Sequence, residues 1–334
     1  MVPTTDRSGP ILLIAAARRM LEGLLTAWAA VSLTFFSLRL AAGDPVASLL
    51  SQGLATPEQA ESLRHSLGLD APLLLQYFRY LGRLIQGNLG VSLYTQRPVS
   101  EVILEQLPNT AQLAMQGLLL AILLGLILGL ASAWLRNAAG RLAANLAGLS
   151  TSLPVAFLGI LILWGCRNLY LLGQTTAISP NLLAPLVLGI ASAGPIARVI
   201  HSGLEDSIQS PYFLAARARG IRRGPRLLWH ALRPALPAAV SLLALEAAFL
   251  FSGTVVTETV FSRPGLGRLL VSAILQGDFP VAEGLVILAA LLYTASHVLS
   301  DLIAMILDPR LRRAGWDAHG ACNCRSYGSS LSSP

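Results

Sequence analysis

The sequence predicts an all-α integral membrane protein, and three observations support that fold class. Hydrophobic residues make up 54% of the 334 residues, and charged residues only 12%, whereas soluble domains usually carry about a quarter charged residues. The apolar residues gather into six long runs, each near the roughly 20 residues that a helix needs to cross a bilayer. The mean hydropathy of +0.63 agrees with both.

The six runs divide the chain into an N-terminal segment 1–19, a six-helix transmembrane domain 20–307 and a tail 308–334. The tail is polar and rich in Gly and Ser, so we expect it to be disordered. It holds Cys322 and Cys324, whose role the sequence leaves open. The expected spans are 20–38, 110–135, 142–165, 181–200, 238–257 and 282–307.

The arginines orient these spans. If every run crosses, sixteen arginines lie on the side of both termini and eight on the other side. Cytoplasmic loops carry an excess of basic residues, so both termini are expected in the cytoplasm. The same bias explains the formal net charge of +7. In a soluble protein that charge would suggest a nucleic-acid partner, and none is expected here.

A long external loop, 41–107, separates the first two spans. Thr56 followed by Pro57 is typical of a helix N-terminus, with Thr56 as the N-cap. A second amphipathic helix is predicted over 72–85, with apolar residues at helical spacing. We therefore expect a small folded cap on the outer side, without a separate domain.

The composition also excludes several activities. All 24 basic residues are arginine, and without a lysine the chain cannot be a conventional P-loop ATPase or form a lysine Schiff base. The sequence contains no His-Glu-x-x-His zinc motif and no Gly-x-Ser-x-Gly elbow. No catalytic residue, metal site or cofactor is therefore expected, and the chain is not expected to be an enzyme.

A basic segment, 202–237, lies between the fourth and fifth runs. Ser210 and Pro211 predict the start of a short helix over 211–219. Ala215 and Ala216 would let another surface approach the helix closely, and Gly220 can end it in a left-handed conformation. From this segment alone, a partner's groove and an anionic lipid surface remain equal alternatives.

The basic segment resembles the cytoplasmic loop by which permease subunits of bacterial ABC importers dock onto their ATPase subunits. The pattern is Ala215-Ala216, three residues, Gly220, then a later Leu236-Pro237. Leu214 stands where the general family has Glu, and the later part reads His230-Ala-Leu-Arg-Pro-Ala-Leu-Pro237 in place of a short Ile-x-Leu-Pro. This variant resembles the dipeptide, oligopeptide and nickel permeases. Further segments outside the basic segment are also similar to this subfamily. They are Leu67-Gly-Leu-Asp-Ala-Pro-Leu73, Gly87-Asn-Leu-Gly-Val-Ser92, Leu107-Pro-Asn-Thr110, Glu258-Thr-Val-Phe-Ser-Arg-Pro-Gly-Leu-Gly-Arg268, Asp278-Phe-Pro280 and Asp308-Pro-Arg310.

The resemblance implies a multi-pass permease of the bacterial plasma membrane with a type I importer fold. Its implied partners are a second permease that is a paralogue of this chain, two ATP-binding subunits and an external substrate-binding protein, all at a lipid bilayer. Residues that would carry coupling to the ATPase are Ala215, Ala216, Arg217, Arg219 and Gly220. Dipeptides, oligopeptides, glutathione and nickel chelates all stay open as substrates.

Glu246 is an ionisable residue near the middle of the fifth span. Such a group normally faces protein or water, so it could line a pathway or be a hydrogen-bonded packing residue. It is also the one feature that favours a different class, an ion-coupled secondary transporter.

Two glycine-containing features have both structural and functional interpretations. Gly125 and Gly129 form a small-xxx-small pair, for which packing within the chain is the better interpretation. Glu258 and the turn 263–267 are expected at the outer ends of spans, where the resemblance implies contact with the binding protein or closure of an outer gate. A plain turn is nearly as good an interpretation.

Overall fold

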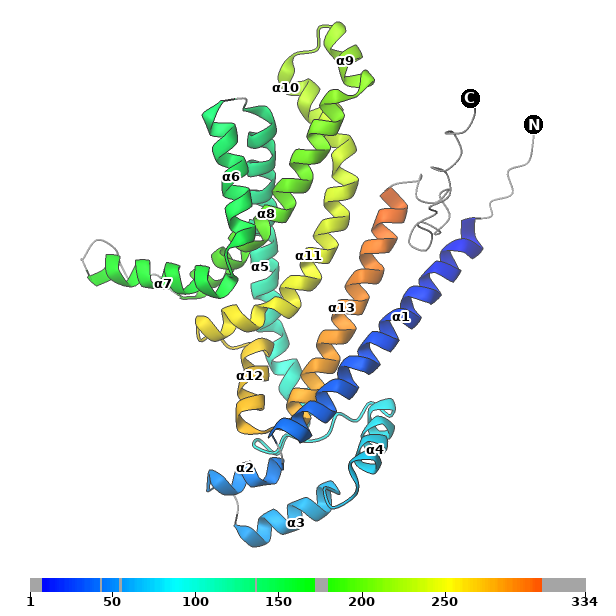
Figure 1. Ribbon diagram of the computed structural model, residues 1–334, viewed down its shortest axis with the longest axis vertical. Helices are drawn as coiled ribbons and strands as arrows, with labels where there is room; N and C mark the ends of the chain where they lie inside the picture. The colour runs from blue at the N-terminus through cyan, green and yellow to red at the C-terminus, as the bar shows by residue number, and fades with distance from the viewer. Residues whose placement is uncertain (1–7, 43, 54–55, 136, 172–179, 308–334) are drawn as a thin grey trace, which may run out of the picture.

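The computed structural model describes residues 8–42, 44–53, 56–135, 137–171 and 180–307, which are nearly all helical (Figure 1). The expected disordered tail, with Cys322 and Cys324, lies outside the described residues. The elements in chain order are α1 Ser8–Ser37, η1 Leu38–Ala42, α2 Pro45–Ser51, α3 Pro57–Leu67, α4 Leu73–Ile85, α5 Val99–Trp134, α6 Ala138–Ser152, α7 Val155–Leu171, α8 Pro180–Gln209, α9 Pro211–Ala218, α10 Arg223–Pro225, η2 Arg226–Leu232, α11 Arg233–Val260, α12 Leu266–Gln276 and α13 Phe279–Leu307.

Five helical segments in the described ranges are long and apolar enough to cross a membrane. They coincide with or overlap the first, second, fourth, fifth and sixth predicted runs. The fifth segment begins earlier than predicted, because helix continues through the basic segment into α11. The five segments are Met20–Leu40, Val99–Trp134, Leu182–Gln209, Arg223–Ala247 and Phe279–Ser300.

The third predicted span, 142–165, is not one straight helix. It is broken into α6 and α7, whose axes are bent by 108°. Pro154 is the physical reason, because proline disfavours the helical conformation of the residue before it. Leu153 accordingly has φ −89° and ψ 126°, an extended conformation. Figure 1 shows α7 running sideways from the bundle, so the pair counts as a sixth span only if it is taken as one broken helix.

The centre of the bundle is the packing of α5 against α8, where the pair Gly125 and Gly129 lies. A Cβ atom on Gly125 would stand 2.7 Å from the Cβ of Ile196. One on Gly129 would stand 2.9 Å from the carbonyl oxygen of Ala197. Both distances are too short for a side chain, so the glycines allow the two helices to touch. The interpretation of this pair as packing within the chain is confirmed.

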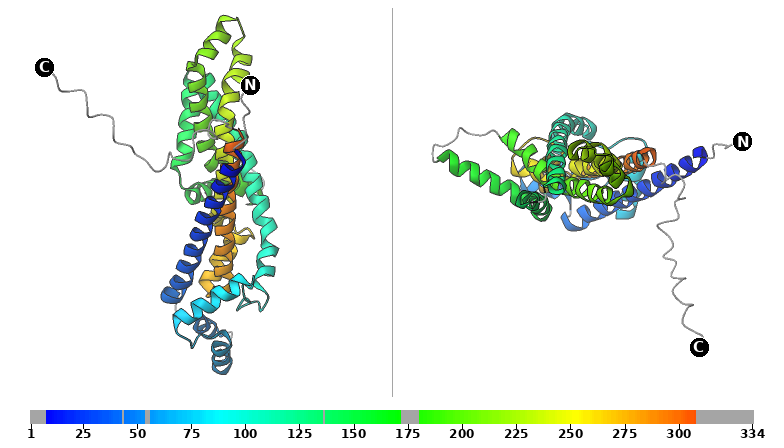
Figure 2. Two further views of the ribbon diagram at one scale, coloured as in Figure 1. Left: turned by 90° about the vertical axis from the view of Figure 1, so that its right-hand side faces the viewer. Right: turned by 90° about the horizontal axis from the view of Figure 1, so that it is seen from above.

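The loop 41–107 forms a cap of short helices, α2 to α4, at one end of the molecule, opposite α9 (Figures 1 and 2). The predicted helix start at Thr56 is confirmed, with Thr56 and Gln59 bonded reciprocally in a capping box. The predicted second helix is confirmed as α4. Tyr77 and Tyr80 of α4 pack against Phe35 of α1, so the cap is fixed to a span. We call the two ends of the molecule the cap end and the α9 end.

Candidate functional site

Helix α9 begins where the sequence predicts it. Ser210 occupies the N-cap position with extended backbone angles, and Pro211 is the first helical residue. The Ser210 hydroxyl does not cap α9, since it donates to the carbonyl of Ser207 in α8 at 2.5 Å. This hydrogen bond links the last turn of α8 to the corner, so the two helices meet at a fixed joint.

The end of α9 is a complete Schellman motif. Gly220 has φ +72°, the left-handed conformation predicted for it. Its N–H donates to the carbonyl of Arg217, and the N–H of Ile221 donates to the carbonyl of Ala216. A Cβ on Gly220 would meet nothing within 4 Å. The glycine is therefore required for its backbone angle and not for lack of space.

One expectation about the faces of α9 is wrong. Ala216 was expected to face a partner, yet it is only 4% exposed. Its side chain and that of Phe213 turn into the chain, because positions three residues apart share one helix face. Phe213 joins a core cluster with Leu227 of η2. Ala215, Arg219 and Gly220 are exposed as expected.

The exposed face of α9 combines apolar and basic side chains. Tyr212 and Leu214 are large apolar residues that remain 45% and 56% exposed. Arg217 and Arg219 follow them, also exposed. A rigidly held helix with such a face suits insertion into a groove of another protein.

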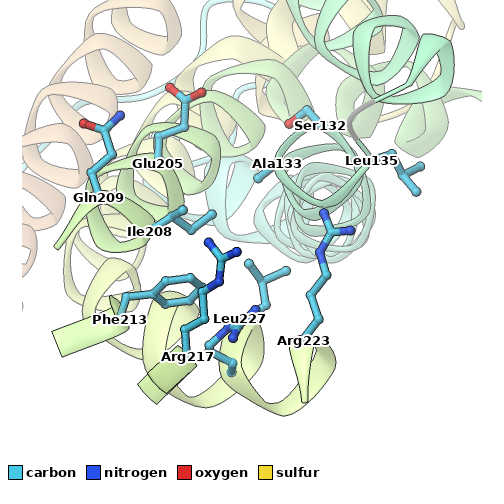
Figure 3. Close-up of a pocket in the computed structure, with 11 residues that line it drawn as sticks. Ser132, Ala133, Leu135, Glu205, Ile208, Gln209, Phe213, Arg217, Arg223 and Leu227 are labelled. Atoms are coloured by element: carbon cyan, nitrogen blue, oxygen red, sulfur yellow. The ribbon is translucent and has the colours of Figure 1, made fainter. Parts of the chain in front are cut away.

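A pocket of about 500 Å³ lies behind α9, on the side toward the bundle (Figure 3). Arg217, Arg223 and Arg226 line it together with the single acid Glu205. The predicted coupling residue Arg217 therefore contributes to the pocket as well as to the surface of α9. The remaining lining residues are Ser132, Ala133, Leu135, Ile208, Gln209, Phe213 and Leu227.

At the cap end, Glu258 is a fully buried hydrogen-bond acceptor. The Thr110 hydroxyl donates to its Oε1 at 2.7 Å. Its Oε2 accepts from the backbone N–H groups of Gly267 at 2.7 Å and Arg268 at 3.1 Å. These N–H groups belong to the first turn of α12, where a carboxylate is favoured. Glu258 thus holds α5, α11 and α12 together.

The glycines of the turn make room for this carboxylate. A Cβ on Gly265 would overlap the carboxyl group of Glu258, and one on Gly267 would overlap the backbone of Val255. The turn is therefore packed around Glu258, and the interpretation as a plain turn accounts for only part of its structure.

Two further buried contacts join distant segments at the cap end. Asp278 accepts from the Ser92 hydroxyl at 2.5 Å and from the N–H of Leu93 at 3.1 Å. Arg39 and Glu283 form an ion pair at 2.5 Å that links η1 to α13. Nearby, burial raises the pKa of the Tyr80 phenol, which favours its neutral form. Sequence reasoning assigned no role to any of these contacts.

Glu246 lies in α11, half-buried, and is hydrogen-bonded to Ser192 of α8. Both residues lie between the two ends of the molecule, within candidate spans. The contact supplies the hydrogen-bond partner that a packing residue at this depth needs. Glu246 as a whole is only partly buried.

The described residues thus form a helical protein with several segments long and apolar enough to cross a membrane, a helical cap at one end and α9 at the other. The family model described as "Binding-protein-dependent transport system inner membrane component" matches residues 99–313. A companion model of the N-terminal region, "Binding-prot-dependent transport system membrane comp, N-term", matches residues 12–114.

Three curated relatives match over nearly their whole length. The dipeptide transport system permease protein DppB of Lactococcus lactis is 35% identical, and the match covers 86% of this chain and 96% of the relative's chain. The glutathione transport system permease protein GsiC of Salmonella paratyphi A is 32% identical, with 88% and 97% covered. A putative peptide transport system permease protein of Brucella abortus is 34% identical, with 84% and 93% covered.

The chain therefore belongs to the family of inner membrane components of binding-protein-dependent transport systems. It is a permease subunit of an ABC importer of the peptide and oligopeptide family, as its motifs predicted. It is a membrane-spanning transport subunit and not itself an enzyme.

Proposed function

We propose that this permease forms a translocation pathway for small peptides in a bacterial plasma membrane. Relatives named for dipeptides, peptides and glutathione support this substrate class, since glutathione is itself a short peptide. The proposed complex contains a second, paralogous permease, two ATP-binding subunits and an external substrate-binding protein. In this arrangement the chain has six spans, both termini are cytoplasmic, and the cap lies outside.

The observation that carries the coupling role is the construction of α9. Its two ends are fixed by Ser210 and by the Schellman motif at Gly220, while Tyr212, Leu214 and Ala215 stay exposed. The exposed face would dock in a groove of the ATP-binding subunit. Because Phe213 is anchored in the core between α8 and η2, a displacement of α9 would be passed to the spans.

Reconstitution of the whole complex tests this function. We expect peptide-loaded binding protein to stimulate ATP hydrolysis and peptide uptake in proteoliposomes that contain this chain. A complex lacking the chain should show neither response. Uptake driven by an ion gradient without ATP would instead support the ion-coupled secondary transporter. Membership of this family gives that alternative no support.

The proposed topology predicts which end of the molecule is accessible from outside. In a cysteine-free background, a cysteine replacing the exposed Ser62 of α3 should react with an impermeant thiol reagent in intact cells. A cysteine replacing the exposed Arg222, at the α9 end, should react only after the membrane is permeabilised. Labelling of position 222 in intact cells would contradict the orientation.

Glu246 is proposed to line the pathway, and its incomplete burial supports this. Glu246→Gln keeps a partner for Ser192, so the complex should assemble normally while uptake falls. Ser192→Ala removes the hydrogen bond but keeps the carboxyl group, and it should affect uptake less. Peptide uptake per assembled complex is the measurement, and unchanged uptake in Glu246→Gln would leave Glu246 a packing residue only.

A further inference from the structure

The pocket behind α9 has an unusual charge for its position. Three arginines line it against one glutamate, Glu205. In the described part of the chain no carboxylate forms an ion pair with any of the three, and Glu205 lies 3.5 Å from His201 instead. The positive charge of the pocket is therefore not neutralised within the structure described.

Two of the three arginines, Arg223 and Arg226, are held in place by their surroundings. Arg223 donates to the carbonyl of Trp134, at the end of α5, at 2.6 Å. Arg226 stacks over the ring of Phe213 at 5.1 Å, and its Nε is buried without a hydrogen-bond partner among the described residues. Figure 3 shows Arg217 and Arg223 reaching up from the α9 side toward the ends of the bundle helices. The pocket thus contains cationic N–H donors in fixed positions, and the Nε of Arg226 has no acceptor among the described residues.

The height of the pocket in the bundle indicates what could supply an anion. The apolar segment Val99–Trp134 of α5 ends at the pocket, which is lined there by Ser132, Ala133 and Leu135. The other lining residues all come from the basic segment 202–237. The ends of apolar spans mark the boundary between hydrocarbon and headgroups. Basic pockets between helices at this boundary suit lipid headgroups.

We propose that this pocket binds the phosphate of an anionic phosphoglycerol lipid headgroup. Arg223 and Arg226 would hold the phosphate oxygens, with Arg217 closing over them. Glu205 and Gln209 can accept hydrogen bonds from the hydroxyls of the glycerol headgroup. The bound lipid would connect α9 to the ends of α5 and α8. This proposal stands on the pocket and the span ends and does not require α9 to dock on an ATP-binding subunit.

The test is lipid retention by the complete permease complex. The complex is purified into nanodiscs of mixed phosphatidylglycerol and phosphatidylcholine, and the bound lipids are counted by native mass spectrometry. We expect phosphatidylglycerol to be retained selectively. The double variant Arg223→Gln/Arg226→Gln should bind it at least roughly tenfold more weakly, given about 1 kcal/mol for each arginine near the membrane surface. Arg222→Gln, an exposed neighbour outside the pocket, is the matched control.

A second variant keeps the test decisive if the double variant assembles poorly. Glu205→Gln removes the one negative charge of the pocket, so retention of phosphatidylglycerol should increase. Equal retention of the two lipids, or no increase in Glu205→Gln, would overturn the proposal. Displacement of the lipid by millimolar inorganic phosphate would assign the pocket to a soluble anion. Unchanged lipid with lost ATP-binding subunit in the double variant would assign it to that protein.

Discussion

Glu258→Leu is expected to cause the largest loss of stability of any single substitution considered for this chain. Leucine would leave the backbone N–H groups of Gly267 and Arg268 and the hydroxyl of Thr110 buried without their acceptor. Each such group costs about 1–3 kcal/mol when its partner is removed. The sum is a large share of the 5–15 kcal/mol that typically separates folded from unfolded protein. Thermal unfolding of the purified chain in detergent, with the yield of inserted protein, measures the loss.

Two further variants separate the hydrogen-bond network from the general effect of losing a charge. Thr110→Val keeps the volume but removes the donor to Glu258 and the acceptor for the N–H of Leu266, so it should be destabilised to a smaller extent. Glu101→Leu removes an exposed carboxylate near the same end and should unfold close to wild type. If Glu258→Leu unfolded at the temperature of Glu101→Leu, Glu258 would not hold the three helices together.

Most of the membrane architecture could be predicted from the sequence because apolar length is a local property. Five of the predicted runs correspond to helical segments long enough to cross. The break in the third run was also visible in principle, since Pro154 follows three hydroxyl residues, 150–152, that bond back to helix carbonyls. Hydropathy alone averaged across the break and so predicted one span.

The caps of the short helices were predictable for the same reason. Thr56, Pro211 and Gly220 each act on backbone within a few residues of themselves, and each stands where it was expected. The side-chain environment of α9 was not predictable in this way. Whether Ala215 or Ala216 faces outward depends on where Phe213 finds its core partners, and those come from η2 and α8.

The buried polar contacts at the cap end were beyond local reasoning. Thr110 and Glu258 are 148 residues apart, and Ser92 and Asp278 are 186 apart. The segments that carry the family resemblance nevertheless contain these four residues. The segments that carry the resemblance at this end are therefore joined by side-chain hydrogen bonds, which is a structural reason for those residue types.

The coupling assignment is best tested at Ala215, which is exposed on α9 and does not contribute to the core, and at Gly220, which follows the helix. Ala216→Trp would disturb packing within the chain, since Ala216 is buried. Ala215→Trp instead adds volume on the exposed face, where a docked partner would tolerate little. The complex should then lose ATP-binding subunit or fail to respond to loaded binding protein, while insertion stays normal. Ala215→Ser is the matched control and should couple normally.

Gly220→Val tests the same coupling element through the backbone. Nothing lies within 4 Å of the added Cβ, so the whole effect comes from holding a β-branched residue at φ +72°. The left-handed conformation costs an ordinary residue about 1–2 kcal/mol, which is enough to loosen the end of α9. Gly220→Asn tolerates the conformation better and should retain most of the stimulation. The decisive measurement is ATP hydrolysis by the reconstituted complex with peptide-loaded binding protein. Wild-type stimulation and uptake in both Gly220→Val and Ala215→Trp would show that α9 does not couple the permease to ATP hydrolysis.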